Sequence, residues 1–368
     1  MNWLDQSHRG DCRDLMRAMI ADGVRVQTIV TSPPYWGLRS YLPDGHPDKA
    51  REIGQEPTLR EFIDTLVGVF DLARELLSDD GTLWLNMGDS YAGSRSGPET
   101  ASTLNGTRRN QTEANRAMTA SRRRDDAPIP RSDVRVDGLK PKDLVGQPWR
   151  LAFALQEAGW WLRQDIIWAK PNPMPESVRD RCTKAHEYLF LLSKSERYYF
   201  DADAMREPRA QDEDSVIFRG GCYVGGAADN GTLGKRKVPG NKSHKGTAAS
   251  SSDEKHRTKA GLVSYAERER SANPSDLGTR NRRSVWTIAT QPYAAAHFAT
   301  FPEALVEPCV LAGSRPGDVV FDPFFGSGTA GQVAQRLGRR FLGCELNPEY
   351  TPLQRDRLRQ PSLMLESA

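Results

Sequence analysis

Cysteine is scarce in this sequence and widely spread. The 368-residue chain contains five cysteines, none in a Cys-x-x-Cys pair: Cys12, Cys182, Cys222, Cys309 and Cys344. This scatter argues against a disulfide scaffold and a cysteine-ligated zinc site, so we expect no metal. No apolar run approaches the roughly 18–20 residues that a membrane-spanning helix needs. The polar, charged N-terminus does not resemble a secretory signal. These absences predict a soluble intracellular protein.

Net charge is also small, but it is unevenly distributed. Lys and Arg number 51 against 48 Asp and Glu, a formal net charge of +3. Residues 92–140 carry +4 and residues 202–285 carry +5, so the rest of the chain carries −6. These two segments are where a polyanion such as a nucleic acid would bind. Solvated loops whose arginines only maintain solubility would have the same composition, so charge alone leaves both interpretations open.

Apolar periodicity predicts alternating strands and helices. The expected elements are a strand at 26–31, a helix at 58–77, a strand at 82–86, a helix at 143–158, strands at 161–168 and 188–193, a helix at 302–312, a strand at 319–321, a helix at 329–337 and a strand at 340–345. Thr58 and Glu61 have the spacing of a capping box, and Asp80-Gly81 predicts a turn. The last strand, helix and strand form a βαβ unit, which implies a parallel sheet.

A glycine loop follows the strand at 319–321 and leads into the next helix. It reads Asp-Pro-Phe-Phe-Gly-Ser-Gly-Thr, starting at Asp322. Gly326 and Gly328 let the backbone turn tightly and approach a ligand closely. About 20 residues later Glu345 ends a strand, where an acid can accept hydrogen bonds from ribose hydroxyls. No Gly-Lys-Ser/Thr follows, and Asp322 would repel phosphate, so a cationic ligand is favoured over a purely structural turn.

The second motif is Ser32-Pro33-Pro34-Tyr35, directly after the strand at 26–31. Ligands of open α/β sheets bind outside the carboxyl ends of the strands, so this motif can face the glycine loop. Two prolines end the strand and leave rigid carbonyl acceptors, while Ser32 adds a hydroxyl and Tyr35 a flat apolar face. Acceptors beside a stacking surface suit a planar base with an exocyclic amino group. In isolation, such a string most often forms only a proline turn.

Together the two motifs resemble those of the DNA methyltransferases that methylate amino groups with S-adenosylmethionine. That family has a tetrapeptide of Asp, Asn or Ser, two prolines and an aromatic residue, and a Phe-x-Gly-x-Gly cofactor loop. Both are present, as Ser32 to Tyr35 and as Phe324 to Gly328. Because the tetrapeptide comes first and the cofactor loop last, the order resembles the β group of the family. The resemblance covers residues 1–91, 141–201 and 285–350.

The resemblance implies a Rossmann-like α/β methyltransferase fold with a mostly parallel central sheet and a small irregular target-recognition region. The implied parts are 1–91 (catalytic, with the tetrapeptide), 92–140 (basic flexible loop), 141–201 (catalytic, middle), 202–285 (DNA target recognition) and 286–368 (catalytic, cofactor-binding). It also implies site-specific methylation of double-stranded DNA by base flipping. Such a protein would be prokaryotic or phage-encoded, cytoplasmic and DNA-associated, a monomer or homodimer, with a cognate restriction endonuclease as a candidate partner.

The resemblance also assigns roles to individual residues. The implied catalytic residues are Ser32, Pro33, Pro34 and Tyr35. The implied cofactor-binding residues are Asp11, Cys12, His297, Phe298, Thr300, Asp322, Pro323, Phe324, Gly326, Ser327, Gly328, Thr329 and Glu345. The implied DNA-binding residues are Arg39, Lys235, Arg236, Lys237, Arg282 and Arg283. Asp322 would lie near the amino acid end of the cofactor and Glu345 on its ribose. Asp11 as an ordinary turn acid and His297 as a helix-start residue remain alternatives.

The implied reaction fits these residue types. An exocyclic amino nitrogen is a weak nucleophile, because its lone pair is delocalised into the ring. Hydrogen bonds from its protons to the Ser32 hydroxyl and the Pro33 carbonyl would free that lone pair for attack on the sulfonium methyl. Positioning and preorganised acceptors would then carry the rate, and Tyr35 would stack on the flipped base.

Three alternatives stay open. In the family, Ser at the first tetrapeptide position mostly accompanies cytosine N4, so Ser32 favours N4-cytosine. A hydroxyl can accept from either amino group, so N6-adenine remains. An RNA target also remains, because phosphate contacts look alike in sequence. The third alternative is a nucleic-acid-binding protein with a decayed or regulatory cofactor site, which the two intact motifs disfavour.

Overall fold

The computed structural model describes residues 2–37, 40–42, 45–92, 138–173, 175–176, 178–208, 279–291 and 301–359. The chain divides into two units, one of Met1–Met205 with Arg283–Ala368 and one of Arg206–Arg282. In the second unit, the described secondary structure is an antiparallel pair of strands, β6 (Arg206–Pro208) and β7 (Thr279–Asn281). Throughout the described part of the chain, no helix is both long and apolar enough to span a membrane.

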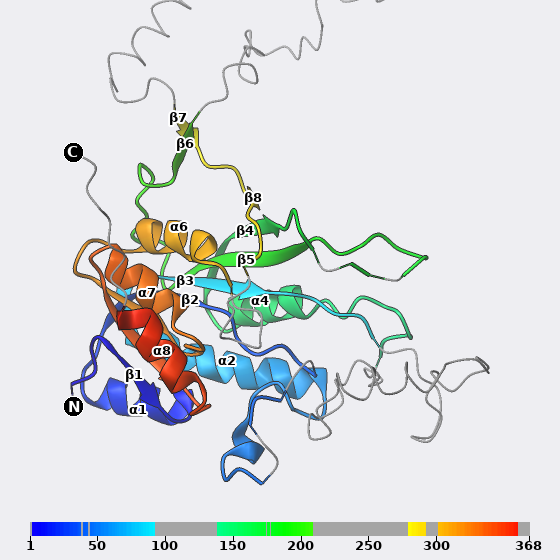
Figure 1. Ribbon diagram of the computed structural model, residues 1–368, viewed down its shortest axis with the longest axis horizontal. Coiled ribbons are helices and arrows are strands. Elements are labelled where there is room, and N and C mark those ends of the chain that lie inside the picture. Colours follow the sequence, from blue (N-terminus) through cyan, green and yellow to red (C-terminus); the bar gives the residue numbers. More distant parts are fainter. Residues whose placement is uncertain are drawn as a thin grey trace, which may run out of the picture. The chain divides into compact units, whose positions relative to one another are not determined.

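The larger unit is built on an eight-stranded sheet in the order β1-β10-β9-β2-β3-β5-β4-β8 (Figure 1). Its strands are β1 (Gln6–Arg9), β2 (Val26–Thr31), β3 (Leu77–Met87), β4 (Trp161–Ala169), β5 (His186–Ser193), β8 (Val285–Thr287), β9 (Val319–Asp322) and β10 (Arg340–Glu345). Its helices are α1 (Cys12–Ala21), the 3₁₀ turn η1 (Lys49–Arg51), α2 (Leu59–Leu76), α4 (Gln147–Glu157), α6 (Glu303–Gly313), α7 (Thr329–Arg336) and α8 (Tyr350–Arg359). Neighbouring strands run parallel, except that β5 is antiparallel to both β3 and β4.

Helices cover both faces of this sheet (Figure 1). One core contains residues of α1, α2 and α4, and the other contains residues of α6 and α7. Trp84 and Leu85 are neighbours on β3 but belong to opposite cores, as the pleat of a strand requires. This arrangement confirms the expected α/β class with a mostly parallel sheet.

The strands β2 and β9 are adjacent in the sheet although almost the whole chain separates them. Thr28 pairs with Val320 and Ile29 with Phe321 in a parallel ladder. From this pair, the sheet extends through β10 and β1 on one side and through β3 on the other. Such a reversal of strand order is where open α/β sheets bind ligands, at the carboxyl ends of the strands. Both sequence motifs begin at this edge.

The sequence placed several helix boundaries well. The expected capping box is present at the start of α2: the Thr58 side chain accepts from the Glu61 N–H at 3.2 Å, and the Glu61 carboxylate accepts from the Thr58 N–H at 3.0 Å. The helices expected at 302–312 and 329–337 are α6 and α7, each within one residue of the expected bounds. Because capping and apolar spacing are local properties, they could be read without knowledge of the fold.

The turn expected at Asp80-Gly81 was wrong, because β3 begins directly at Leu77. Leu77 pairs with Val26 and Thr82 with Thr28, so the residues between them form a bulge inside the strand. The Gln27 side chain donates to Asp80 Oδ1 at 3.0 Å and holds this bulge. A Cβ on Gly81 would come within 2.8 Å of the Leu77 side chain, which explains the glycine.

The helix expected at 143–158 begins later, at Gln147. Asp89, just after β3, accepts hydrogen bonds from the N–H groups of Gly146 (2.9 Å) and Gln147 (3.1 Å) and so caps the helix from outside it. The structure also contains α1, α8 and the short strands β1 and β8, which were not expected from the apolar pattern. The expected basic loop is described only at its two ends, and most of the expected recognition region lies outside the described residues.

Candidate functional site

The tetrapeptide and the glycine loop meet at the carboxyl ends of β2 and β9. Thr31, the last residue of β2, donates a 2.6 Å hydrogen bond from its hydroxyl to Asp322 Oδ1 at the end of β9. The Phe324 N–H donates to the same oxygen at 2.9 Å. One buried carboxyl group therefore holds both loops, which explains why an acid stands at the end of β9.

The glycine loop owes its shape to a buried phenylalanine. Phe325 is 2% exposed, and its N–H donates to the Cys344 carbonyl at 2.9 Å. Its ring fills a space where a Cβ on Gly343 would lie 2.3 Å away and a Cβ on Gly331 2.5 Å away. Gly328 has φ +89° as the residue that precedes α7, a conformation that favours glycine. The packing of the Phe325 ring therefore fixes the conformation of the loop.

Glu345 connects the end of β10 to this loop. Its Oε2 accepts from the Gly326 N–H at 2.7 Å, and its Oε1 accepts from the Asn347 N–H at 2.7 Å. Burial raises the pKa of Glu345 to about 7, although these two bonds act in the opposite direction. Each oxygen retains a second lone pair. The carboxyl group can therefore hold the loop and still accept a hydrogen bond from a ligand.

Asp322 is a buried acid with one unused oxygen. The residue is 1% exposed, and its Oδ2 has no hydrogen-bond partner among the described residues. Burial raises the pKa of Asp322 to about 7, opposed by the bonds from Thr31 and Phe324. An unpartnered buried acceptor is costly unless a ligand or a proton satisfies it. Asp322, which was expected to bind the cofactor, is not among the residues that line the cavity between the two loops.

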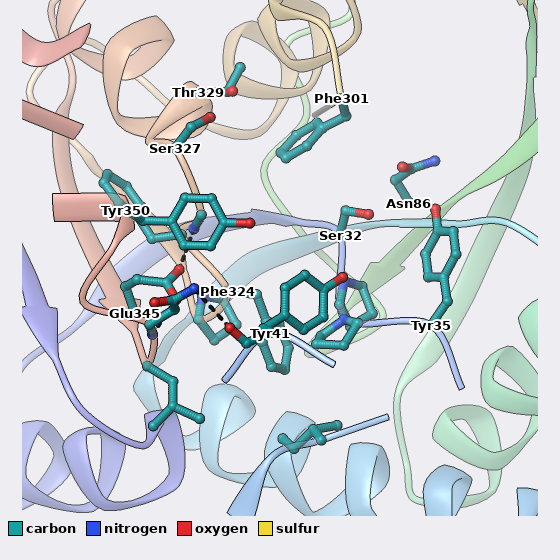
Figure 2. A pocket seen from close by; sticks show the side chains of 18 of the residues that line it. Ser32, Tyr35, Tyr41, Asn86, Phe301, Phe324, Ser327, Thr329, Glu345 and Tyr350 are labelled. Atoms are coloured by element: carbon teal, nitrogen blue, oxygen red, sulfur yellow. Dashed lines mark hydrogen bonds between the residues drawn. The ribbon is translucent and has the colours of Figure 1, made fainter. Parts of the chain in front are cut away.

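The two loops enclose a cavity of about 960 Å³. Most of the expected site residues line it: Asp11, Cys12, Ser32, Pro33, Pro34, Tyr35, Pro323, Phe324, Gly326, Ser327, Thr329 and Glu345. Figure 2 shows Glu345, Phe324 and Tyr350 toward one end of the cavity and Asn86 and Tyr35 toward the other, with Ser32 between them. The structure thus brings the tetrapeptide and the glycine loop to one cavity, as expected for two loops at the carboxyl ends of strands in one sheet.

Asp11 lines the cavity, but its carboxylate is already engaged. It is the N-cap of α1, where it accepts from the Arg13 N–H at 2.9 Å. It also forms ion pairs with Arg13 at 2.6 Å and Arg51 at 3.0 Å. Burial alone would raise the pKa of Asp11, but the bonds and charges of these two arginines lower it below its ordinary value. This geometry supports the alternative of a structural turn acid. Burial raises the pKa of the neighbouring Cys12 to about 12, so its thiol stays protonated.

Tyr35 of the tetrapeptide is held by a polar partner that sequence reasoning missed. Its hydroxyl donates to Glu187 Oε2 at 3.0 Å. Burial raises the pKa of Tyr35 well above its ordinary value, and the charge of Glu187 raises it further. The phenol is therefore protonated and acts as a donor.

The cavity also contains residues that were not expected. They include Tyr41, Asn86, Lys170, Lys184, Glu187, Phe301, Asn347 and Tyr350. Asn86 ends the strand expected at 82–86, and Glu187 immediately precedes the one expected at 188–193, so their positions at strand ends were a usable signal. Lys184 and Tyr350 lie where the sequence predicted no element, and nothing local marks them.

Several expected site residues lie outside the described residues: Arg39, Lys235, Arg236, Lys237, His297, Phe298 and Thr300. Arg282 and Arg283 are described, and neither lines the cavity. The Arg283 carbonyl accepts from Trp286 Nε1 at 2.8 Å, which anchors the chain just before β8.

Comparisons with known proteins give three findings. The family model described as DNA methylase, for N6 and N4 methyltransferases, matches residues 26–355. The type II methyltransferase M.Cfr9I of Citrobacter freundii is 41% identical over 349 residues, which cover 95% of this chain and 86% of that protein. The type II methyltransferase M.SmaI of Serratia marcescens is 41% identical over 350 residues, which cover 95% of this chain and 89% of that protein.

Among solved structures, the cytosine-N4-specific PvuII DNA methyltransferase superposes with a TM-score of 0.52 at 16% sequence identity. The match covers 96% of this chain and 85% of that chain. At this level of identity the similarity concerns the fold. It confirms the expected Rossmann-like methyltransferase fold.

Proposed function

The chain belongs to the DNA methylase family of N6 and N4 methyltransferases, and on this basis we propose that it methylates the exocyclic N4 of cytosine in duplex DNA. The observation that carries the proposal is Ser32, which lines the cavity between the cofactor loop and Tyr35. A neutral hydroxyl at the first tetrapeptide position supports cytosine N4, since family members acting on adenine N6 mostly have Asp there. The type II relatives support a role in a restriction-modification system.

S-adenosylmethionine is the methyl donor of this family, and the cavity fits it. When bound, it supplies a methyl group on a positively charged sulfur. The free lone pairs of Glu345, which lines the cavity, suit a ligand that carries hydroxyl groups. A volume of about 960 Å³ lies at the upper end of the range for ligand sites, roughly 300–1,000 Å³, and leaves room for a base as well.

The residues of the tetrapeptide would prepare the amino nitrogen. The Ser32 hydroxyl and the Pro33 carbonyl would accept its protons and free its lone pair for in-line attack. Because these acceptors are preorganised on a short rigid loop, they need not reorganise as charge develops. Tyr35 would stack on the base, which must leave the duplex to reach the cavity.

The experiment that tests the proposal identifies the methylated base. Duplex DNA would be incubated with the protein and isotope-labelled cofactor, digested to nucleosides and separated by mass spectrometry. Label in N4-methylcytosine supports the proposal. Label in N6-methyladenine would overturn the cytosine assignment, and label only in RNA offered in parallel would overturn the DNA substrate.

We propose further that residues 202–285 and 92–140 contact the DNA backbone, because both carry net positive charge. Arg282, Arg283 and the Lys235-Arg236-Lys237 run lie in the first of these segments, and Arg39, just after the tetrapeptide, is proposed as a further DNA contact. Affinity should then depend on salt with a slope of about −0.9 per phosphate contacted. Replacing Lys235, Arg236 and Lys237 together by Ala should flatten this slope, whereas an unchanged slope would identify a merely solvated loop.

Lys184 is a separate candidate for a nucleotide contact inside the cavity. Its ammonium is buried, lines the cavity, and has no hydrogen-bond partner among the described residues. Burial lowers the pKa of Lys184, although the charges of Asp89 and Glu187 oppose this. An acceptor on the flipped nucleotide would satisfy it.

A further inference from the structure

Glu187, on β5, is the centre of a hydrogen-bonded cluster in the cavity wall. Its Oε2 accepts from the Tyr35 hydroxyl at 3.0 Å and from Asn86 Nδ2 at 3.3 Å. Its Oε1 accepts from the ammonium of Lys170. Figure 2 shows the phenol end of Tyr35 beside the Asn86 side chain. The cluster therefore lies next to the tetrapeptide.

This cluster fixes the orientation of the Asn86 amide. Asn86 Nδ2 donates both to Glu187 Oε2 and, at 3.1 Å, to the Tyr188 carbonyl. Both neighbours can only accept, so a flipped amide would bring its oxygen against two acceptors. With Nδ2 held in this way, Oδ1 is left with no hydrogen-bond partner among the described residues, and Asn86 lines the cavity.

Both oxygens of Glu187 are engaged by donors. Lys170 and Glu187 form an ion pair whose side chains are 17% and 18% exposed, so Lys170 holds Oε1 while Oε2 faces Tyr35 and Asn86. A glutamine in place of Glu187 could donate an N–H to the oxygen of a flipped Asn86 amide, so that only the Tyr188 carbonyl would still oppose the flip. Gly88 makes the arrangement possible, since a Cβ there would lie 2.9 Å from the Tyr35 ring and 3.3 Å from Glu187 Cδ.

Strand register places Asn86 beside the first residue of the tetrapeptide. Leu85 of β3 pairs with Thr31 of β2 in a parallel ladder, so Asn86 and Ser32 are the next residues on adjacent strands. Both residues line the cavity, where Asn86 is 2% exposed. One substrate group in the cavity could therefore contact both.

Building on the proposed amino methylation, we propose that Asn86 Oδ1 and the Ser32 hydroxyl share one proton of the amino group of the flipped base, while the Pro33 carbonyl accepts the other. Glu187 is then the positioning residue that keeps the amide in the required orientation. In the transfer, the amino nitrogen would bond to the methyl carbon as the methyl–sulfur bond breaks and a neutral thioether leaves. The positive charge would pass to the nitrogen until it loses one of its two protons to solvent, and a fixed amide oxygen on one of these protons would stabilise that charge without reorganisation.

The test uses the full chain, duplex DNA and S-adenosylmethionine, with turnover and cofactor affinity measured separately. Glu187→Gln should lower kcat on the order of 100-fold, the scale for one preorganised hydrogen bond, and leave cofactor affinity unchanged. Asn86→Leu removes the amide but leaves Glu187 its bonds to Tyr35 and Lys170, and should lower kcat alike. The exposed Glu196→Gln is the matched charge control and should keep wild-type kcat.

The decisive variant combines Glu187→Gln with Asn86→Leu. If Glu187 acts by orienting the Asn86 amide, its replacement in a chain without that amide should cost little more. The double variant should therefore have roughly the kcat of Asn86→Leu alone. Wild-type kcat in Asn86→Leu, or additive losses in the double variant, would overturn the inference. Methylation of adenine by the wild type would contradict the cytosine assignment alone, and these variants would still test the role of Asn86.

Discussion

The Thr31 hydroxyl donates to Asp322 at 2.6 Å and thereby joins the strand that leads into the tetrapeptide to the strand that leads into the cofactor loop. Both side chains are 1% exposed. Because a buried hydrogen bond to a carboxyl group is strong and directional, it fixes the distance between the two loops. The proposed reaction needs such a fixed distance, since methyl transfer requires the donor and acceptor atoms in line.

Removing this bond should affect both stability and the site. We expect Thr31→Val to lower the free energy of unfolding by about 1–3 kcal/mol, because a buried acceptor loses its partner, and to weaken cofactor binding. Denaturant titration and calorimetry measure the two effects. Thr28→Val is the matched control. Thr28 lies on β2 like Thr31, and its hydroxyl forms a buried hydrogen bond with the Thr82 hydroxyl on β3 at 2.9 Å. Thr28→Val should lower the free energy of unfolding by a similar amount and leave cofactor affinity unchanged. An equal loss of cofactor affinity in both variants would contradict a special role for Thr31.

The buried acids should make stability depend on pH in a particular direction. The pKa of Asp322 is raised from 3.8 to about 7 in the folded protein. Between these values the folded protein keeps a proton that the unfolded chain releases. The stabilisation that this proton adds to the free energy of unfolding is therefore complete below about pH 4. It is lost as pH rises toward 7, by about 1.4 kcal/mol per pH unit. Urea unfolding of the cofactor-free protein at pH 5, 6 and 7 should show a shallower decline for Asp322→Asn than for the wild type. Parallel declines would contradict this assignment.

The close packing around the Phe325 ring predicts that two glycine substitutions will change the free energy of unfolding in opposite directions. Gly343→Ala places a Cβ 2.3 Å from the buried ring, so we expect a loss of several kcal/mol and of cofactor binding, on the scale of overpacking. Gly68 is exposed within α2, with nothing within 4 Å of an added Cβ. Gly68→Ala should therefore stabilise the protein by roughly 0.5–1 kcal/mol through helix propensity. Thermal unfolding of the two variants measures both effects. Shifts of the midpoint temperature in the same direction would refute the packing argument.

Glu345 should matter for the cofactor through both of its roles. Glu345→Gln replaces one acceptor oxygen by a donor that faces the N–H of either Gly326 or Asn347. We expect cofactor affinity to fall by about 1–3 kcal/mol, the scale for a hydrogen bond to a charged group. Glu349→Gln, an exposed acid four residues later, is the control. Calorimetry that finds the same affinity in Glu345→Gln and in the control would remove Glu345 from the binding site.

The tetrapeptide should act on the base and leave cofactor binding alone. Ser32→Ala and Tyr35→Ala should keep cofactor affinity and lose most methyl transfer. Tyr35→Ala should also lose about 1–3 kcal/mol of DNA affinity, the value of aromatic stacking on a base. Tyr35→Phe keeps the ring and removes the bond to Glu187, so it should retain the DNA affinity. Full turnover in Ser32→Ala would show that another acceptor prepares the nitrogen.

Local chemistry in the sequence was enough for much of the catalytic unit. The capping box of Thr58 and Glu61 placed the start of α2, because its donors and acceptors lie within one helical turn. The glycine loop and the tetrapeptide could each be recognised from a few consecutive residues, and the βαβ order of β9, α7 and β10 indicated a parallel sheet. The class of reaction followed from these two motifs and their order along the chain.

Properties that depend on distant pairing were decided only by the tertiary structure. The strand β1 is a four-residue polar segment that exists because its backbone pairs with β10, and α4 begins where Asp89 caps it from the end of another element. The buried hydrogen bond between Thr31 and Asp322 likewise joins residues far apart in the chain, as do the hydrogen bonds by which Glu187 orients the Asn86 amide. The raised pKa values of Asp322 and Glu345 come from burial in the assembled fold. Burial and hydrogen-bond partners of this kind arise only when the sheet assembles, so a sequence pattern with local range cannot contain them.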